Sequence, residues 1–134
     1  AQPEKVVKRV RRLQTSAFDI DLPDNAVDSI FSMRLLHHIG DASHRMALLR
    51  EFHRVSRDSV IVSLWVDGNF KAWKRKRLQL QREADGGSDG YQNRFVLPAV
   101  TVEAEFRKAG FTIQNHLDFI PLYAMWRVYI LRKR

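Results

Sequence analysis

The sequence has no cysteine, which excludes disulfide bonds, cysteine-ligated zinc sites and thiol catalysis. No apolar run reaches about 18 residues, so a membrane-spanning helix is not expected. The first ten residues, AQPEKVVKRV, lack the apolar core of a signal peptide, and we expect a cytoplasmic protein. The glycine cluster DGGSDG, residues 85–90, follows a charged segment instead of a strand, which excludes a dinucleotide-binding fingerprint there.

Acidic residues are in deficit. Lys and Arg number 23 against 15 Asp and Glu, for a formal net charge of +8. The basic excess lies in residues 8–12, 71–77 and 132–134. One interpretation is solvated faces and a basic chain end. The other is attraction to an anionic partner such as nucleic acid, phospholipid or a phosphorylated substrate, and charge alone does not choose between them.

Apolar residues are abundant enough for one core. The chain has 134 residues, 45% of them hydrophobic, and no internal repeat, so we expect a single domain over residues 1–134. Alternating and β-branched apolar runs predict strands, and helical spacing of apolar residues predicts helices. Strands are expected at 26–33, 59–66, 111–119 and 125–134, with a weak one at 10–18, and helices at 41–56, 70–84 and 102–109.

The ends of two predicted helices carry characteristic residues. Asp41 is a candidate N-cap for the helix that follows it, and Thr101 is a candidate N-cap for the last helix. Glu103 and Glu105 would lie near the positive end of that last helix. Gly110 fits the C′ position just after it.

The order of elements predicts an α/β fold. Strands that alternate with helices favour a parallel sheet with helices on both faces. The last two strands are joined by a link around Pro121 that is too short for a parallel crossover, so the last strand should pair antiparallel. We expect the sheet order 27–33, 59–66, 124–132, 111–118.

Four segments, in order along the chain, resemble segments of one enzyme family. IDLPDNAVD (20–28) is similar to LPFPDNSFD, RLLHHI (34–39) to LHHL, LLREFHRVSRDSVIVS (48–63) to LREIARVLKPGGLLVIS, and FRKAGF (106–111) to LLEEAGF. These are segments of class I S-adenosylmethionine-dependent methyltransferases, the methyltransferase type 11 or ubiquinone-biosynthesis-like group. Each segment alone is weak, whereas four in family order are fairly specific, and the resemblance covers roughly residues 15–134.

The resemblance implies a Rossmann-like methyltransferase sheet and S-adenosylmethionine as cofactor. The family's glycine-rich loop, first two strands and ribose-binding acidic residue have no counterpart, so the chain resembles the C-terminal part of such an enzyme, with the N-terminal strands missing. His38 would lie near the methyl-transfer site as a catalytic residue. The residues that the resemblance implies for cofactor binding are Ser16, Ala17 and Phe18 at the adenine, and Ser32, Met33, Arg34 and Leu35 along the methionine moiety.

The adjacent histidines have other interpretations. On a strand, His37 and His38 would point to opposite sides, and no HExxH spacing is present, so we expect no metal site although Asp41 and His44 are near in sequence. His38 can also simply pack under the helix that begins at Asp41 and bond a backbone group. As a catalytic group it would serve as the base for a hydroxyl acceptor.

Several aromatic residues also have two interpretations. Phe18 either stacks beside the adenine or belongs to the core. Trp65, Phe70, Trp73 and Tyr91 fall where methyltransferases carry substrate-facing insertions, and the alternative is that they are core aromatics.

Two functions are consistent with these observations. The first is an S-adenosylmethionine-dependent methyltransferase, or its C-terminal portion, acting on a small-molecule acceptor. Methyl transfer depends on alignment of donor and acceptor more than on acid–base groups. The alternative is a catalytically inactive α/β module that binds an anionic partner through its basic surface. We expect no nucleic-acid acceptor, since no motif for one is found.

The strand at 27–33 lacks a neighbour on its outer edge. In the resembling family the first strand covers that edge, and this chain has no counterpart for it. Unpaired N–H and C=O groups invite pairing with another strand. Either residues 10–18 fold back onto the edge, or two chains meet there across a two-fold axis, and we expect the homodimer.

Overall fold

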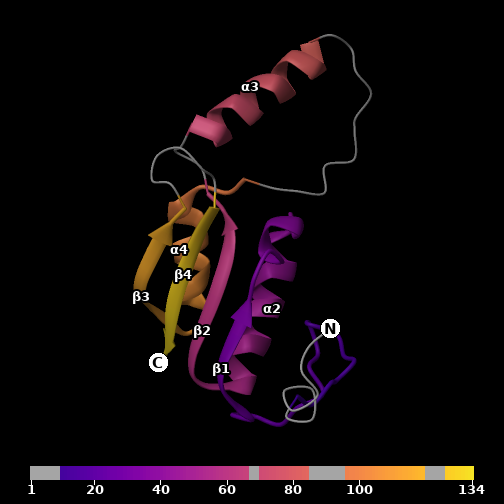
Figure 1. The fold of residues 1–134 in the computed structure, drawn as a ribbon, viewed down its shortest axis with the longest axis vertical. Helices are drawn as coiled ribbons and strands as arrows, with labels where there is room; N and C mark the ends of the chain where they lie inside the picture. The colour runs from indigo at the N-terminus through magenta and orange to yellow at the C-terminus, as the bar shows by residue number, and fades with distance from the viewer. Residues whose placement is uncertain (1–9, 67–69, 85–95, 120–125) are drawn as a thin grey trace.

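The computed structural model describes residues 10–66, 70–84, 96–119 and 126–134 (Figure 1). The glycine cluster at 85–90, Tyr91 and the link at Pro121 lie outside the described residues. The described elements, in chain order, are β1 (Val27–Ser32), the 3-10 helix η1 (Leu36–His38), α2 (Ala42–Val55), β2 (Ser56–Trp65), α3 (Phe70–Ala84), α4 (Ala99–Lys108), β3 (Phe111–Asp118) and β4 (Trp126–Lys133).

The described strands form one sheet in the order β1-β2-β4-β3, which confirms the predicted order. β1 and β2 are parallel, and β4 runs antiparallel to both of its neighbours. β3 therefore points in the same direction as β1 and β2. The carboxyl ends of three strands consequently meet at one edge of the sheet, which is the edge where open α/β sheets bind ligands.

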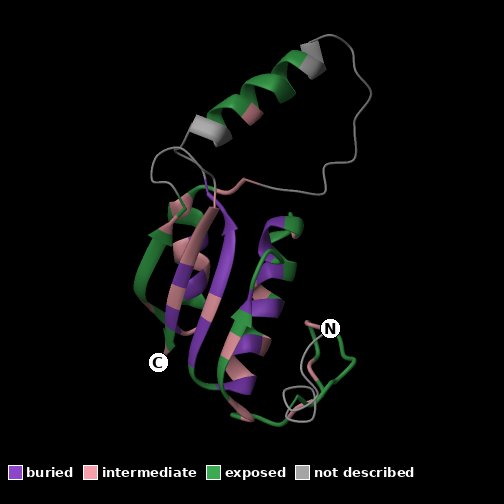
Figure 2. Ribbon diagram, viewed as in Figure 1, coloured by how far each residue is buried: buried purple, intermediate pink, exposed green. Residues whose placement is uncertain are grey.

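α2 and α4 pack on the same face of the sheet, so the expectation of helices on both faces is wrong. Both helices share one buried cluster with the strands, which includes Leu48, Phe106 and Tyr129. Figure 2 shows the buried residues concentrated on β2 and along one side of α2. The reason is geometric: both crossovers step across the sheet in the same direction, and right-handed crossovers in one direction place their helices on one face.

The start of α2 is as predicted. The Asp41 carboxylate accepts hydrogen bonds from the backbone N–H groups of Ser43 (2.7 Å) and His44 (3.4 Å). The hydrogen bonds from Ser43 are the main reason that the pKa of Asp41 lies below its usual value. This cap fixes where the chain turns from η1 into α2.

The start of α4 differs from the prediction. The helix begins at Ala99 with Pro98 in the N-cap position, and the Thr101 N–H donates to the Pro98 carbonyl (3.1 Å). Thr101 is thus inside the first turn and is not the cap. Proline is tolerated here because its missing N–H is not needed outside the helix. With the earlier start, Glu103 and Glu105 fall beyond the first turn and do not lie at the positive end.

The end of α4 confirms the prediction for Gly110. This residue follows the C-cap with a φ of 101°, a region that favours glycine. A Cβ at this position would lie 2.8 Å from Nε2 of His53, a side chain of α2. Burial is the main reason that the pKa of His53 lies below its usual value. The glycine therefore lets α4 turn into β3 close to α2.

Residues 10–18 do not form the predicted weak strand, and they do not fold back onto β1. Among the described residues β1 pairs with β2 alone, and the N-terminal segment has only an isolated bridge between Ser16 and Asp19. Local hydrogen bonds replace strand pairing: the Thr15 hydroxyl donates to the Asp19 carbonyl (3.0 Å), and the Phe18 N–H donates to the Ser16 hydroxyl (3.2 Å).

α3 has the predicted bounds but stands apart from the sheet (Figure 1). Trp73 is exposed, so its interpretation as a core aromatic is wrong, and Leu80 is exposed as well. No helix in the described part of the chain is long and apolar enough to cross a membrane.

Candidate functional site

The carboxyl ends of β1 and β2 lie side by side and form the floor of the candidate site. Ser32, the last residue of β1, pairs with Val62 of β2. The Ser32 side chain is buried, and its hydroxyl has no hydrogen-bond partner within the described residues. A buried hydroxyl without a hydrogen-bond partner carries a desolvation cost, which makes Ser32 unusual among the polar residues of the sheet.

The three residues after β1 form a tight turn. Arg34 has a φ of 64°, and its N–H donates to the Ser63 hydroxyl of β2 (2.8 Å). A positive φ is uncommon for a residue other than glycine and clusters at functional sites. Met33 and Leu35 on either side remain exposed, so the turn presents two apolar side chains at the edge of the sheet.

The two histidines occupy different environments. His37 is buried, and its ring stacks on Trp65 with 4.7 Å between centroids. The same ring meets Trp126 edge-on at 4.9 Å. His38 is exposed, with its ring centroid 4.0 Å from that of His37. The histidines are adjacent on a 3-10 helix, in which successive side chains point about 120° apart, so one lies in the core and the other at the surface.

The aromatic cluster of His37, Trp65 and Trp126 was missed from the sequence. Trp65 ends β2 and pairs directly with Trp126, the first residue of β4. The Arg34 guanidinium lies 5.6 Å from the Trp126 ring centroid, which is within cation–π range. The signal in the sequence was the pair of tryptophans at the end of one strand and the start of its antiparallel neighbour. Trp65 is thus a core aromatic, as one of the two interpretations proposed.

No metal site is apparent among the described residues. They contain no group of three His, Asp or Glu side chains placed to hold a metal ion.

Ser16, Ala17 and Phe18 lie in an exposed turn beside α2. The Phe18 ring is 47% exposed and meets His44, in the first turn of α2, edge-on at 6.1 Å. The interpretation of Phe18 as a core residue is therefore wrong, while Ala17 does pack partly against the core. Ser32 to Leu35 lead through η1 into the same end of α2, so both predicted segments flank that end. No hydrogen bond joins them in the described part of the chain.

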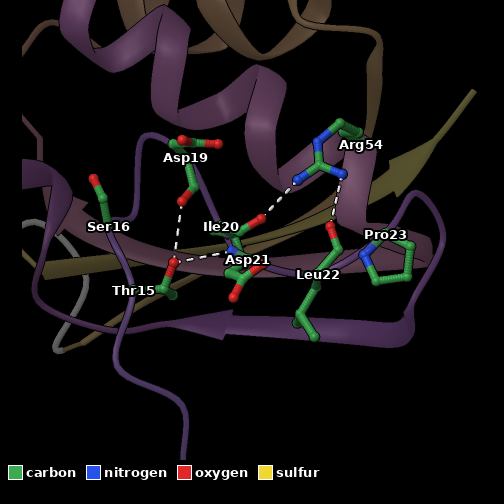
Figure 3. Close-up of a pocket in the computed structure, with 8 residues that line it drawn as sticks. All are labelled: Thr15, Ser16, Asp19, Ile20, Asp21, Leu22, Pro23 and Arg54. Carbon is green, nitrogen blue, oxygen red and sulfur yellow. Dashed lines mark hydrogen bonds between the residues drawn. The ribbon is translucent and has the colours of Figure 1, made fainter.

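Of the residues in these two segments, only Ser16 lines the hollow shown in Figure 3. It has a volume of about 750 Å³ and is lined by Thr15, Ser16, Asp19, Ile20, Asp21, Leu22, Pro23 and Arg54. The Arg54 guanidinium, from the last turn of α2, donates to the carbonyls of Ile20 (2.9 Å) and Leu22 (2.8 Å). Hydrogen bonds with Glu51 and Asp24 raise the pKa of Arg54 and keep it charged. The hollow therefore lies near the start of β1, and the hydrogen bonds from Arg54 hold the loop of residues 19–23 in place.

Arg45 is a buried anchor beneath the candidate site. Its guanidinium donates to both carboxylate oxygens of Glu105 on α4 (2.9 and 2.7 Å). It also donates to the carbonyls of Ile39 (3.0 Å) and Gly40 (2.8 Å), which connect η1 to α2. The sequence carried a signal for this role, because Arg45 lies on the same helical stripe as the buried Leu48, three residues on.

A second polar network lies at the carboxyl end of β3. Asp118 accepts a hydrogen bond from Arg127 of β4 (3.1 Å), and the Tyr129 hydroxyl donates to Glu103 of α4 (3.1 Å). Burial raises the pKa of Tyr129, so the phenol stays protonated and able to donate. This network ties α4 to the strands and is not directed at the turn after β1.

Comparisons with known proteins agree with this geometry. Residues 1–64 match the family model described as "Methyltransferase domain". No curated protein matches the chain significantly. The family match ends at β2 and thus contains β1, the turn after it and both histidines.

Solved structures of methyltransferases share the fold over most of the chain. A SAM-dependent methyltransferase from Methanosarcina mazei has a TM-score of 0.64 at 14% identity, over 89% of this chain and 65% of its own. Magnesium protoporphyrin IX methyltransferase from Synechocystis PCC 6803, solved with bound SAH, has a TM-score of 0.64 at 10% identity. That match covers 91% of this chain and 50% of that one. A SAM-dependent methyltransferase from Thermotoga maritima has a TM-score of 0.64 at 16% identity, and the match covers 91% of this chain and 63% of that one.

The chain spans less than two thirds of the length of each of these three structures. At such identities the likeness establishes the fold, which is the methyltransferase sheet with its antiparallel last strand. The family match over residues 1–64 covers just under half of the chain. The chain is therefore similar to SAM-dependent methyltransferases in sequence over these residues and in fold over most of its length.

Proposed function

We propose that this chain takes part in methyl transfer from S-adenosylmethionine to a small-molecule acceptor. The observation that carries the proposal is the turn after β1, in which a buried, unpartnered Ser32 hydroxyl lies beside the exposed Met33 and Leu35. It supports a site for a ligand with both polar and apolar parts. The match of residues 1–64 to the methyltransferase domain supports the choice of cofactor.

The chemical types of the residues at this turn suit S-adenosylmethionine. Ser32, Met33, Arg34 and Leu35 would hold its methionine moiety, because the turn offers a hydroxyl, backbone polar groups and apolar contacts together. Ser16, Ala17 and Phe18 would hold the adenine, with the exposed Phe18 ring available for stacking. When bound, the cofactor supplies an electrophilic methyl group on a sulfonium.

His38 is the proposed catalytic residue. It is exposed at the carboxyl edge, and Arg45 holds the carbonyls of the residues that follow it. A neutral ring nitrogen of His38 can accept the proton of a hydroxyl acceptor as that oxygen becomes a nucleophile. The buried His37 stacks on Trp65 and serves to position the loop.

Titration calorimetry with S-adenosylmethionine tests the cofactor site. Wild-type chain should bind with micromolar affinity, and Met33→Arg should weaken binding by at least about tenfold, since a charged side chain replaces an apolar contact. The control Val100→Arg, at an exposed position on α4, should bind like wild type. His38→Gln should also bind normally, because His38 is assigned to the acceptor.

If the wild-type chain shows no binding, or if Met33→Arg binds as well as Val100→Arg, the site is not at this turn. Absence of binding by wild type would favour the alternative function, a catalytically inactive module that binds an anionic partner. The observation that favours this alternative is the net charge of +8.

We also propose that two chains pair through the outer edge of β1. Within the described residues this strand is at the sheet edge, and its Phe31 side chain is 69% exposed. Sedimentation at micromolar concentration should give a dimer for wild type and a monomer for Phe31→Lys, because a charge on an edge strand opposes pairing. Leu117→Lys places the same charge on β3, the opposite edge, and should leave the dimer intact. A stable wild-type monomer with fast amide exchange at 27–33 would refute this pairing.

A further inference from the structure

α3 combines strong positive charge with exposed apolar side chains. It contains a single acidic residue, Glu83, among its charged residues. Its basic residues are Lys71, Lys74, Arg75, Lys76, Arg77 and Arg82. Such a helix attracts anionic partners, and the attraction is strongest at low ionic strength.

The apolar side chains that the structure describes on α3 are exposed. Trp73 is 54% exposed and Leu80 is 66% exposed, and Leu78 is exposed as well. Trp73 and Leu80 are seven residues apart, which places them two turns apart on one side of the helix. The Arg77 guanidinium lies 5.4 Å from the Trp73 ring centroid, so a cation and an aromatic ring are adjacent on this side. Figure 2 shows α3 as an exposed helix that stands clear of the buried sheet.

One contact links α3 to the candidate site. The Arg75 guanidinium lies 4.9 Å from the Trp65 ring centroid, at the carboxyl end of β2. The first half of α3 is therefore near the edge of the sheet where ligands bind, while Leu78 and Leu80 lie farther along the helix. A partner that contacts the exposed side of α3 would lie close to that edge.

We propose that α3 docks on the surface of an anionic lipid bilayer. Its 15 residues are about 22 Å long and strongly charged, so the helix lies in the interface and does not span the membrane. Trp73 and Leu80 enter the boundary between headgroups and acyl chains, and the Lys and Arg side chains contact the lipid phosphates. Nucleic acid would satisfy the charges as well, but it gives no partner to an exposed Leu80.

The proposal does not depend on methyl transfer. It rests on the charge and exposure of α3, and it would hold if the chain bound no S-adenosylmethionine. Calorimetry with the cofactor tests the proposed function, and the vesicle-binding assay tests the docking surface, so either proposal can be refuted without the other.

Co-sedimentation of the full chain with vesicles tests the docking surface. The chain should bind vesicles of phosphatidylcholine with about one third phosphatidylglycerol, and should not bind pure phosphatidylcholine. Lys74→Gln with Arg77→Gln should weaken partitioning by at least about tenfold. Trp73→Ala with Leu80→Ala should weaken it by about tenfold or more, because the apolar insertion is lost.

Matched controls on α4 separate this surface from net charge and from general hydrophobicity. Arg107→Gln with Lys108→Gln removes the same two charges, and Val100→Ala shortens an exposed apolar residue. Both variants should bind anionic vesicles like wild type. The proposal is overturned by equal binding to both kinds of vesicle, by no binding to either, or by equal effects of the α3 and α4 variants. Binding of a single-stranded RNA oligonucleotide without binding to anionic vesicles would also overturn it.

Discussion

Arg45→Ala is expected to lower the free energy of unfolding by about 3–5 kcal/mol. The Arg45 side chain is buried and donates to both oxygens of Glu105, which is also largely buried. Removal of one partner leaves the other charge buried without compensation, and this is the costly case for a buried ion pair. The carbonyls of Ile39 and Gly40 lose their donor at the same time. Urea unfolding followed by circular dichroism measures the change.

Two further variants separate the ion pair from helix propensity and from packing. Arg50→Ala, at an exposed position of the same helix, should change stability by less than about 0.5 kcal/mol. Arg45→Met combined with Glu105→Leu should recover more than half of the loss, because an apolar pair of similar size carries no buried charge. If Arg45→Ala were as stable as Arg50→Ala, the bidentate contact between α2 and α4 would not exist in solution.

Trp65→Ala is expected to cost about 3–5 kcal/mol. The Trp65 side chain is only 7% exposed at the end of β2. Its neighbours at the carboxyl ends of the strands include the stacked His37 ring, the Trp126 ring at 5.6 Å and the Arg75 guanidinium. Truncation removes buried apolar area and leaves a cavity that these partners fill only in part. His37 would lose its stacking partner, so the exposed His38 would also lose its fixed position.

Trp73→Ala is the matched control, since it makes the same substitution at an exposed position on α3. It should change stability by no more than about 1 kcal/mol. Thermal unfolding of the two variants side by side measures the difference. Equal unfolding midpoints for Trp65→Ala and Trp73→Ala would mean that the aromatic cluster at the carboxyl edge does not contribute to the fold.

Local patterns predicted most of the secondary structure. The β-branched run of residues 59–66 and the Asp41 cap depend on neighbours within a few residues, and both were found. The short link around Pro121 was sufficient to predict that β4 lies antiparallel, because chain length limits how far a connection can reach. The prediction of Thr101 as an N-cap was wrong: its side-chain acceptor favoured that position, but the helix begins at Ala99, with Pro98 as the N-cap.

The candidate site was predicted in part. The segment Ser32 to Leu35 was predicted from the resemblance, and it lies at the carboxyl end of β1. The residues around Arg34 and Ser32 do not indicate, by their type or spacing, that Arg34 has a positive φ or that the Ser32 hydroxyl is buried. Periodicity also could not predict which of the two histidines is buried. His37 is buried against Trp65, which lies 28 positions later in the chain.

The sequence by itself determined the class of fold and the antiparallel last strand, because these depend on local periodicity and connection length, and its motifs gave the resemblance to methyltransferases together with the expected order of the strands. Only the tertiary structure decided that Arg45 is buried, that His37 lies in the core while His38 does not, and that α2 and α4 share one face. These outcomes depend on which distant residues meet. Arg45 can be buried only because Glu105, sixty residues later, returns on a helix placed on the same side of the sheet by a right-handed crossover.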